Sequence, residues 1–301
     1  MKCRLCPHKC GAYRDFDTAG GKCNLPLTAR VARIAPHFWE EPPISGTNGS
    51  GAVFFSGCSL KCVFCQNYGI SHEKFGKNVS LERLSEIFFE PYEKGAHNIN
   101  HVNPTHYTLA IEKVLSEKKP PIPVVYNCGG YEKVQSLKML EGLIDIYLPD
   151  FKYISAERAG KYSSAENYPE TALKALMEMK RQCPENVFDS DGLMKKGMIV
   201  RHLILPKNTN QSLKILDSIK ENLGTDTHIS LMAQYTPMGK LHNTPELQRR
   251  ITEREYEKVL NYALDIGFQN IYTQDFDSAT EEYIPDDKIS LNTFPAETLG
   301  N

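Results

Sequence analysis

Three cysteines lie within eight positions of the chain, in the stretch GCSLKCVFCQNYGIS at residues 57–71. Cys58, Cys62 and Cys65 have the spacing of metal ligands, which buried free thiols have no reason to keep. A closed zinc site needs four ligands, and His72 is the nearby candidate for the fourth. Thiolates also hold iron–sulfur clusters, normally through four cysteines, so three would leave one iron open. Such an iron could bind and reduce a small molecule.

A second group of cysteines lies near the N-terminus, where Cys3, Cys6, Cys10 and Cys23 follow the pattern C-x2-C-x3-C-x12-C. The segment is rich in turn-forming residues and poor in apolar ones. A bound metal could stabilise it, because the free energy of metal binding contributes to folding. The pattern leaves structural zinc and an auxiliary iron–sulfur cluster open, with zinc ahead by a small margin and disulfides behind both. His8 could take the place of one of these cysteines as a ligand, but it is interpreted as a solvated loop residue.

The elements that must position these cysteines follow from hydrophobic periodicity. The apolar run AVFF at 52–55 is bounded by glycines and predicts a buried strand that leads into the cysteine loop. Beyond that loop, segments of strand and helix character alternate. The expected strands are 97–104, 121–130, 143–153, 197–206, 228–239 and 269–274, and the expected helices are 79–95, 105–119, 131–142, the region 155–185, 210–224 and 245–267. This alternation predicts right-handed βαβ units and a parallel sheet.

The motif C-x3-C-x-φ-C, with Phe64 as its apolar residue, resembles the signature of the radical S-adenosylmethionine (SAM) superfamily. The resemblance implies that Cys58, Cys62 and Cys65 hold a [4Fe-4S] cluster whose open iron chelates SAM. One electron from the cluster then cleaves SAM to a 5′-deoxyadenosyl radical, which abstracts a hydrogen atom from the substrate. The electron would come from a reduced flavodoxin or ferredoxin.

A doubly wound open sheet would give the same alternation, and the cysteine motif favours a partial barrel. We therefore expect an α/β fold, a partial (β/α)6 TIM-like barrel of parallel strands with an N-terminal Cys-rich extension. The expected division is a metal-binding extension at 1–50, the barrel at 51–275 and a polar tail at 276–301.

Polar residues recur where the predicted strands end, which is the face that binds ligands in parallel barrels. One such residue alone would be read as a loop residue with satisfied hydrogen bonds. Asp150 and Lys152 flank Phe151 with a period of two, so both side chains can point to one side and orient a zwitterion such as the methionine part of SAM. The full set is Asn100, Asn103, Tyr126, Asn127, Cys128, Asp150, Lys152, Arg201, His202, Gln234 and Tyr235.

The resemblance extends further along the chain, from Cys3 to about Gln274. PDFK and RHLILP resemble elements of the glycyl-radical-enzyme activases. The whole chain is similar to the pyruvate formate-lyase-activating-enzyme-like proteins of uncertain substrate, through CRLCPHKCG, WEEPPISGTNGSGAVFFSGCSLKCVFCQNY, NINHVNPTHY, VVYNCGGYEKV, DIYLPDFKY, VRHLILP and SLMAQYTP. This similarity implies SAM contacts at Phe64, Asn127, Asp150, Lys152 and Arg201.

Two elements of the true activases are absent. HVNPTHY at 101–107 stands in place of the Gly-Gly-Glu type element that meets the SAM amino group, and there Asn103 or Thr105 could offer an oxygen. The late histidine-bearing element is replaced by AQYTP. Activation of a glycyl radical enzyme is therefore a family-level analogy. No catalytic residue beyond the cofactor contacts is predicted.

Between the two cysteine groups lie Trp39, Glu40 and Glu41 in a segment rich in proline and glycine, which argues against a packed helix. The two glutamates could face a substrate, and at least one is expected to be solvated. Cys128 is expected at the barrel mouth, where it could touch SAM or substrate, and Cys183 is expected to have no role in the chemistry.

The 301 residues carry a formal net charge of −2 with no long basic run, which argues against a nucleic-acid partner. The N-terminus lacks an apolar signal region, and no run of about 18 apolar residues occurs, so we expect a cytoplasmic protein without a membrane partner. The leading expectation is hydrogen abstraction from a protein or peptide. The alternatives are modification of a small metabolite and a non-catalytic iron–sulfur electron carrier.

Overall fold

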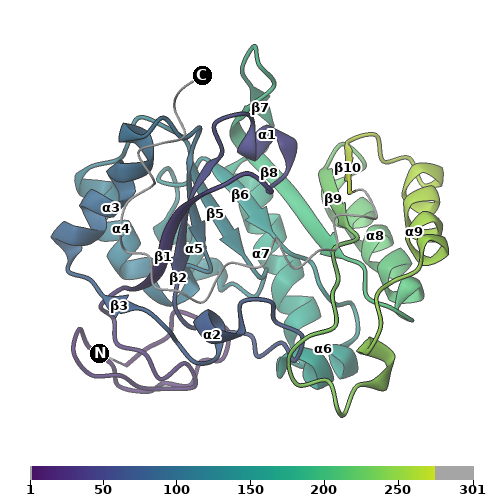
Figure 1. Cartoon of the computed structure of the whole chain (residues 1–301), viewed down its shortest axis with the longest axis horizontal. Helices are drawn as coiled ribbons and strands as arrows, with labels where there is room; N and C mark the ends of the chain where they lie inside the picture. Colours follow the sequence, from purple (N-terminus) through teal and green to yellow (C-terminus); the bar gives the residue numbers. More distant parts are fainter. Residues whose placement is uncertain (1, 275–301) are drawn as a thin grey trace.

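The sheet at the centre of the molecule is mostly parallel and has the strand order β10-β9-β8-β6-β5-β4-β2-β1-β3, with β7 paired to β8 (Figure 1). The computed structural model describes residues 2–274, so the tail predicted at 276–301 lies outside the described residues. The strands are β1 (Arg30–His37), β2 (Ser50–Phe55), β3 (Lys77–Asn78), β4 (Ile99–Val102), β5 (Val124–Cys128), β6 (Ile146–Pro149), β7 (Val187–Phe188), β8 (Met194–Leu203), β9 (His228–Met232) and β10 (Ile271–Thr273).

Pairing is parallel from β2 through β4, β5, β6, β8 and β9 to β10, and antiparallel where β1 joins β2 and β3 and where β7 joins β8. Every residue of β2, β5 and β6 is buried, as expected for strands covered on both faces. Within residues 2–274 the edge strands β3 and β10 are not joined to each other, so the sheet stays open. This confirms the predicted fold class, a mixed α/β structure consistent with a partial TIM-like barrel.

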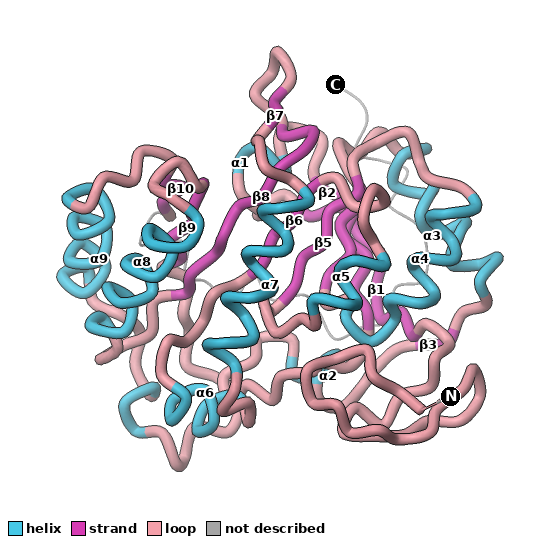
Figure 2. The backbone as a smooth tube through the Cα atoms, turned by 180° about the vertical axis from the view of Figure 1, so that it is seen from behind, coloured by secondary structure: helices cyan, strands magenta, loops and turns pink. Residues whose placement is uncertain are grey.

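Helices line the outer side of the strands in an arc formed by α3, α4, α5, α7, α8 and α9 (Figure 2). Ser80 caps α3 by accepting a hydrogen bond from the Arg83 amide, as its position before an apolar helix predicts. The helices are α1 (Pro42–Ser45), α2 (Tyr68–Ser71), α3 (Leu81–Glu93), η1 (Thr105–Tyr107), α4 (Thr108–Glu117), α5 (Val134–Met139), α6 (Ala156–Ser163), α7 (Tyr168–Gln182), α8 (Thr209–Leu223), η2 (Pro245–Leu247) and α9 (Glu253–Asp265). None of the helices in the described part of the chain has both the length and the apolar character needed to cross a bilayer.

Two expectations about local structure were wrong. The segment with two prolines after Glu41 does form a short helix, α1, in which Pro43 and Ile44 are buried. Proline is tolerated there because the first helical turn needs no amide donor. The helix expected over 245–267 begins only at residue 253, where Thr252 and Glu255 form a capping box, and η2 takes up the residues before it. The sequence analysis also missed β1.

Candidate functional site

The cysteine loop follows β2 and is held by backbone hydrogen bonds on two sides. The Lys61 and Val63 amides donate to the carbonyls of Ser163 (3.0 Å) and Tyr162 (2.9 Å) at the end of α6. On the other side the Lys240 amide donates to the Val63 carbonyl at 3.0 Å. These contacts fix the main chain between Cys58 and Cys65, so the thiols have defined positions before any group binds.

Each of the three thiols has a hydrogen-bond partner close to its sulfur. The Leu60 amide donates to Cys58 Sγ at 3.4 Å. Cys62 Sγ lies 2.9 Å from the Ser163 hydroxyl, and Cys65 Sγ lies 3.1 Å from the Ser71 hydroxyl. Donors of this kind stabilise thiolate sulfur and the sulfurs of iron–sulfur sites.

Burial and the neighbouring thiols raise the pKa of both Cys58 and Cys62, so these two thiols stay neutral when no metal is bound. Burial, with the neighbouring thiols of Cys62 and Cys65, raises the pKa of Cys58 to about 12. Burial also raises the pKa of Cys62, although the Lys152 ammonium opposes this shift. Such a site binds metal in its thiolate form only because the charge of the bound ions lowers the pKa of the ligating thiols.

Three thiols are the donor type and number expected for an iron–sulfur cluster with one open iron. Among the described residues, no three His, Cys, Asp or Glu side chains converge closely enough to hold one metal ion. A [4Fe-4S] cluster takes each thiolate at a different iron, so its cysteines are spread farther apart than the ligands of zinc. His72, the candidate fourth zinc ligand, hydrogen-bonds to Ser71 Oγ at 2.8 Å and stacks on Tyr68.

A network of ion pairs lies at the carboxyl ends of the strands, opposite the cysteine loop. Arg201 of β8 donates from Nε to Asp150 Oδ1 at 3.0 Å, and from Nη2 to Asn127 Oδ1 at 2.6 Å. Lys152 Nζ donates to the other oxygen of Asp150 at 2.5 Å. The cations hold the pKa of Asp150 below its usual value even though burial acts in the opposite direction.

Glu40 completes this network from the segment between β1 and α1. Its Oε1 accepts from the side-chain amides of Asn100 and Asn127, each at 2.9 Å, and its Oε2 accepts from Arg201 Nη1 at 3.1 Å. Next to it, Glu41 is also buried, and burial raises the pKa of its carboxyl. The expectation that at least one of these glutamates is solvated was therefore wrong, because β1 and α1 carry both into the interior.

A cavity of about 240 Å³ joins the cysteine loop to this network. It is lined by Cys62, Cys65 and five of the predicted SAM contacts, namely Phe64, Asn127, Asp150, Lys152 and Arg201. The structure thus brings together residues that are up to 139 positions apart in the chain, between Cys62 and Arg201. Phe64 also packs edge-to-face on Tyr235, with ring centroids 5.6 Å apart.

Asn103 and Thr105 lie apart from this cavity. Asn103 has a left-handed backbone (φ 61°), and its side-chain amide donates to the Gly57 carbonyl just before the cysteine loop. Thr105 Oγ1 donates to Glu132 Oε1 at 2.6 Å in the interior. Glu132 was missed by the sequence analysis, and burial raises the pKa of its carboxyl to about 7.

Cys128 and Cys183 are both buried, and neither lines the cavity of the cysteine loop and the network. The thiol of Cys183 donates to the Asp145 carbonyl at 3.4 Å.

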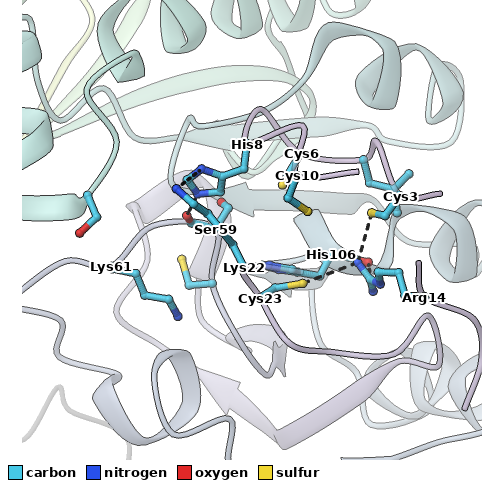
Figure 3. A pocket seen from close by; sticks show the side chains of 13 residues that line it. Cys3, Cys6, His8, Cys10, Arg14, Lys22, Cys23, Ser59, Lys61 and His106 are labelled. Atoms are coloured by element: carbon cyan, nitrogen blue, oxygen red, sulfur yellow. Dashed lines mark hydrogen bonds between the residues drawn. The ribbon is translucent and has the colours of Figure 1, made fainter. Parts of the chain in front are cut away.

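The four N-terminal cysteines line a second cavity, of about 210 Å³, which residues of the cysteine loop also line (Figure 3). Cys58 faces this cavity rather than the first one. His8 is half-buried, and its Nε2 lies 2.7 Å from the Ser59 carbonyl. The interpretation of His8 as a solvated loop residue was therefore wrong.

Comparison with known proteins gives one curated relative and a set of similar folds. The chain matches no protein-family model. It is 30% identical over 280 residues to the uncharacterized protein MJ0674 of Methanocaldococcus jannaschii, and the match covers 90% of this chain and 76% of the archaeal protein. Among solved structures, Streptococcus suis SuiB bound to the precursor peptide SuiA has a TM-score of 0.50 at 13% identity. That match covers 73% of this chain and 47% of SuiB, so the chain spans about half the length of the structure it resembles, and the likeness concerns the fold.

Proposed function

We propose that this chain, which belongs to the same protein family as the uncharacterized protein MJ0674 of Methanocaldococcus jannaschii, is a radical SAM enzyme. The observation that carries the proposal is the cavity in which Cys62 and Cys65 face Asp150, Lys152 and Arg201. Two of the three cluster thiols and the charged groups for a zwitterionic cofactor thus line one space. The likeness of the fold to SuiB supports the same proposal.

Cys58, Cys62 and Cys65 would hold a [4Fe-4S] cluster in their thiolate forms. When bound there, the cluster supplies the electron that cleaves SAM to methionine and a 5′-deoxyadenosyl radical. The amide of Leu60 and the hydroxyls of Ser163 and Ser71 then donate to the ligating sulfurs, which makes the added negative charge less unfavourable.

The charged network would orient the methionine part of SAM. Arg201 and Lys152 can pair with its carboxylate, and Asp150 can accept from its ammonium group. The amino and carboxylate groups of SAM bring one positive and one negative charge, so these ion pairs can exchange partners without leaving their own charges uncompensated. Phe64 offers an apolar ring face within the same cavity. Asn103 stays a predicted contact without support from its position.

The substrate is proposed to be a protein or peptide, from which the radical abstracts a hydrogen atom, with a glycyl radical enzyme as one case. Within residues 2–274 the sheet is not closed into a full barrel, which is compatible with a large substrate, and the structure of SuiB with a bound precursor peptide supports this class. A reduced flavodoxin or ferredoxin is the proposed electron donor. The alternatives are a small metabolite as substrate and a non-catalytic electron carrier.

The test is SAM cleavage by protein reconstituted with iron and sulfide in the absence of oxygen. With dithionite and SAM, 5′-deoxyadenosine should form with the wild type and with the control Cys183→Ala, and not with Cys62→Ala. Cys183 is a matched control because it is an equally buried thiol that lines neither cavity. SAM should also change the EPR spectrum of the reduced cluster. A fully loaded wild type that neither cleaves SAM nor responds to it in EPR would favour the electron carrier.

Coexpression with candidate partners separates the two substrate classes. A protein substrate that is a glycyl radical enzyme would acquire an EPR doublet in the presence of the wild type and not of Cys62→Ala. A small-molecule substrate would instead increase 5′-deoxyadenosine formation in the purified system without a partner protein.

A further inference from the structure

Thiols from two separate segments of the chain line the cavity between the N-terminal segment and the cysteine loop. Cys3, Cys6, Cys10 and Cys23 all line it (Figure 3), and Cys58 of the cysteine loop lines it as well. We infer that the four N-terminal cysteines hold a second iron–sulfur cluster, placed next to the first so that electrons pass between them. The claim that these electrons are then used to cleave SAM rests on the proposed function.

The size of the cavity favours a cluster over zinc. Four thiolates around one zinc ion lie at about 2.3 Å from it and leave no free space between them. Here the four N-terminal cysteines, together with Cys58 and eight other residues, line a space of about 210 Å³, whereas one water needs only roughly 10–15 Å³. Within the described residues no three ligating side chains converge on a single point. A polynuclear cluster, which binds each thiolate at a different iron, fits this spacing.

The wall of the cavity provides positive charge and close backbone packing. Arg14 is buried, and its Nη1 lies 3.7 Å from Cys3 Sγ and 3.9 Å from Cys23 Sγ. Lys22 and Lys61 also line the space. A cluster with four thiolate ligands is anionic, so these cations stabilise it.

Gly21 has a left-handed backbone (φ 74°), and a β-carbon there would lie 2.8 Å from Cys10 Sγ. A side chain at residue 21 would therefore clash with this sulfur, so the main chain can come this close to it only at a glycine.

The two proposed clusters would be neighbours. Cys58 faces the second cavity while Cys62 and Cys65 face the first, so the three thiols of one site lie between the two spaces. His8, two residues after Cys6, contacts the carbonyl of Ser59 at 2.7 Å and joins the two loops directly. The second cluster would take one electron from the reduced flavodoxin or ferredoxin and return to its oxidised state when it passes that electron to the first.

Metal analysis of two variants tests the second site without using SAM chemistry. The variant Cys58→Ala, Cys62→Ala, Cys65→Ala should keep about four iron atoms per chain, roughly half of the wild-type content, and an EPR signal on reduction with dithionite. The variant Cys6→Ala, Cys23→Ala should lose the same amount, and Cys183→Ala should lose none. One zinc per chain in the triple variant, or a folded triple variant without metal, would overturn the inference. SAM has no part in this measurement, so failure of the proposed function would leave its result unchanged.

Magnetic coupling in the reduced wild type tests whether the two proposed clusters lie close together. This measurement does not depend on the folding of the triple variant. Two reduced clusters in adjacent cavities should give a broadened or split EPR spectrum, and SAM should perturb only part of the signal. The spectrum of Cys6→Ala, Cys23→Ala should be that of one uncoupled cluster. A wild-type spectrum that equals the sum of two independent clusters would contradict the electron path, and a single cluster signal that SAM perturbs completely would contradict the second site.

Discussion

Cys62 Sγ lies 2.9 Å from Ser163 Oγ, and the two residues come from different parts of the fold, the cysteine loop and the end of α6. The same hydroxyl lies 2.7 Å from the phenol of Tyr153. When the sulfur carries negative charge, Ser163 must donate to it and can accept from Tyr153, so the two hydroxyls form a short chain of donors toward the proposed cluster.

Ser163→Ala should make the midpoint potential of the proposed cluster more negative. A donor to a ligating sulfur favours the reduced, more negative state, so its removal disfavours reduction. We expect a shift on the order of 50 mV, close to a tenfold change in the reduction equilibrium for one electron. Tyr153→Phe should shift the potential in the same direction by less. Redox titration followed by EPR measures both, with exposed Ser116→Ala as control, and equal potentials in all variants would refute the role of Ser163.

Arg201→Gln should weaken SAM binding by more than tenfold and lower the free energy of unfolding by about 3 kcal/mol, because it leaves the Glu40 carboxylate without its cation and Asp150 with Lys152 alone. Equilibrium binding of SAM and chemical denaturation measure the two effects separately. Arg181→Gln is the control, since Arg181 forms its ion pairs on the half-exposed surface of α7. Normal SAM affinity in Arg201→Gln would remove Arg201 from the cofactor site.

Gly239→Ala should lower the iron content, because a β-carbon at residue 239 would lie 2.4 Å from the Val63 carbonyl inside the cysteine loop. Gly142→Ala is a matched control: both glycines have a left-handed backbone, with φ of 77° and 80°, but nothing lies within 4 Å of a β-carbon at residue 142. Both variants carry the cost of that backbone conformation. Iron analysis after identical reconstitution should separate them, and equal loss in both would assign the effect to the backbone alone.

The pH dependence of stability should contain a contribution from Glu132. Burial raises the pKa of its carboxyl to about 7, so between pH 4.5 and 7 the folded state binds a proton that the unfolded state has released. Stability contributed by this residue is therefore complete below pH 4.5 and falls as pH rises to 7, by at most about 3 kcal/mol. Relative to Glu132→Gln, the wild type should therefore have a higher free energy of unfolding at pH 5 than at pH 8. Exposed Glu117→Gln should show no such change, and parallel behaviour of wild type and Glu132→Gln would exclude the contribution.

The sequence was sufficient for the parts of the site that depend on local pattern. Asp150 and Lys152 point to one side of an extended segment because they are two residues apart, and Arg201 lies at the matching level of the neighbouring strand β8. The alternation of strands and helices predicted the parallel sheet because each segment is long and regular. The capping box at Thr252 and Glu255 was visible in the sequence and would have corrected the predicted start of α9.

Other parts depend on contacts between distant segments. Glu40 pairs with Arg201 across 161 positions, and no local pattern around Glu40 distinguishes it from a solvated glutamate. Ser163 reaches Cys62 across 101 positions from an otherwise polar helix. The cavity shared by the N-terminal cysteines and Cys58 likewise exists only once the extension packs beneath the cysteine loop.

The hydrogen bonds of the Glu40 carboxylate limit which amino acids homologues can have at the positions around it. It accepts hydrogen bonds from residues of β4, β5 and β8, so one side chain satisfies Asn100, Asn127 and Arg201 together. A homologue without an acidic residue at position 40 would leave these three donors without the carboxylate that accepts from all of them. We therefore expect the amino acids at these four positions to covary, and a homologue with a neutral residue at position 40 to have exchanged the arginine at position 201 as well.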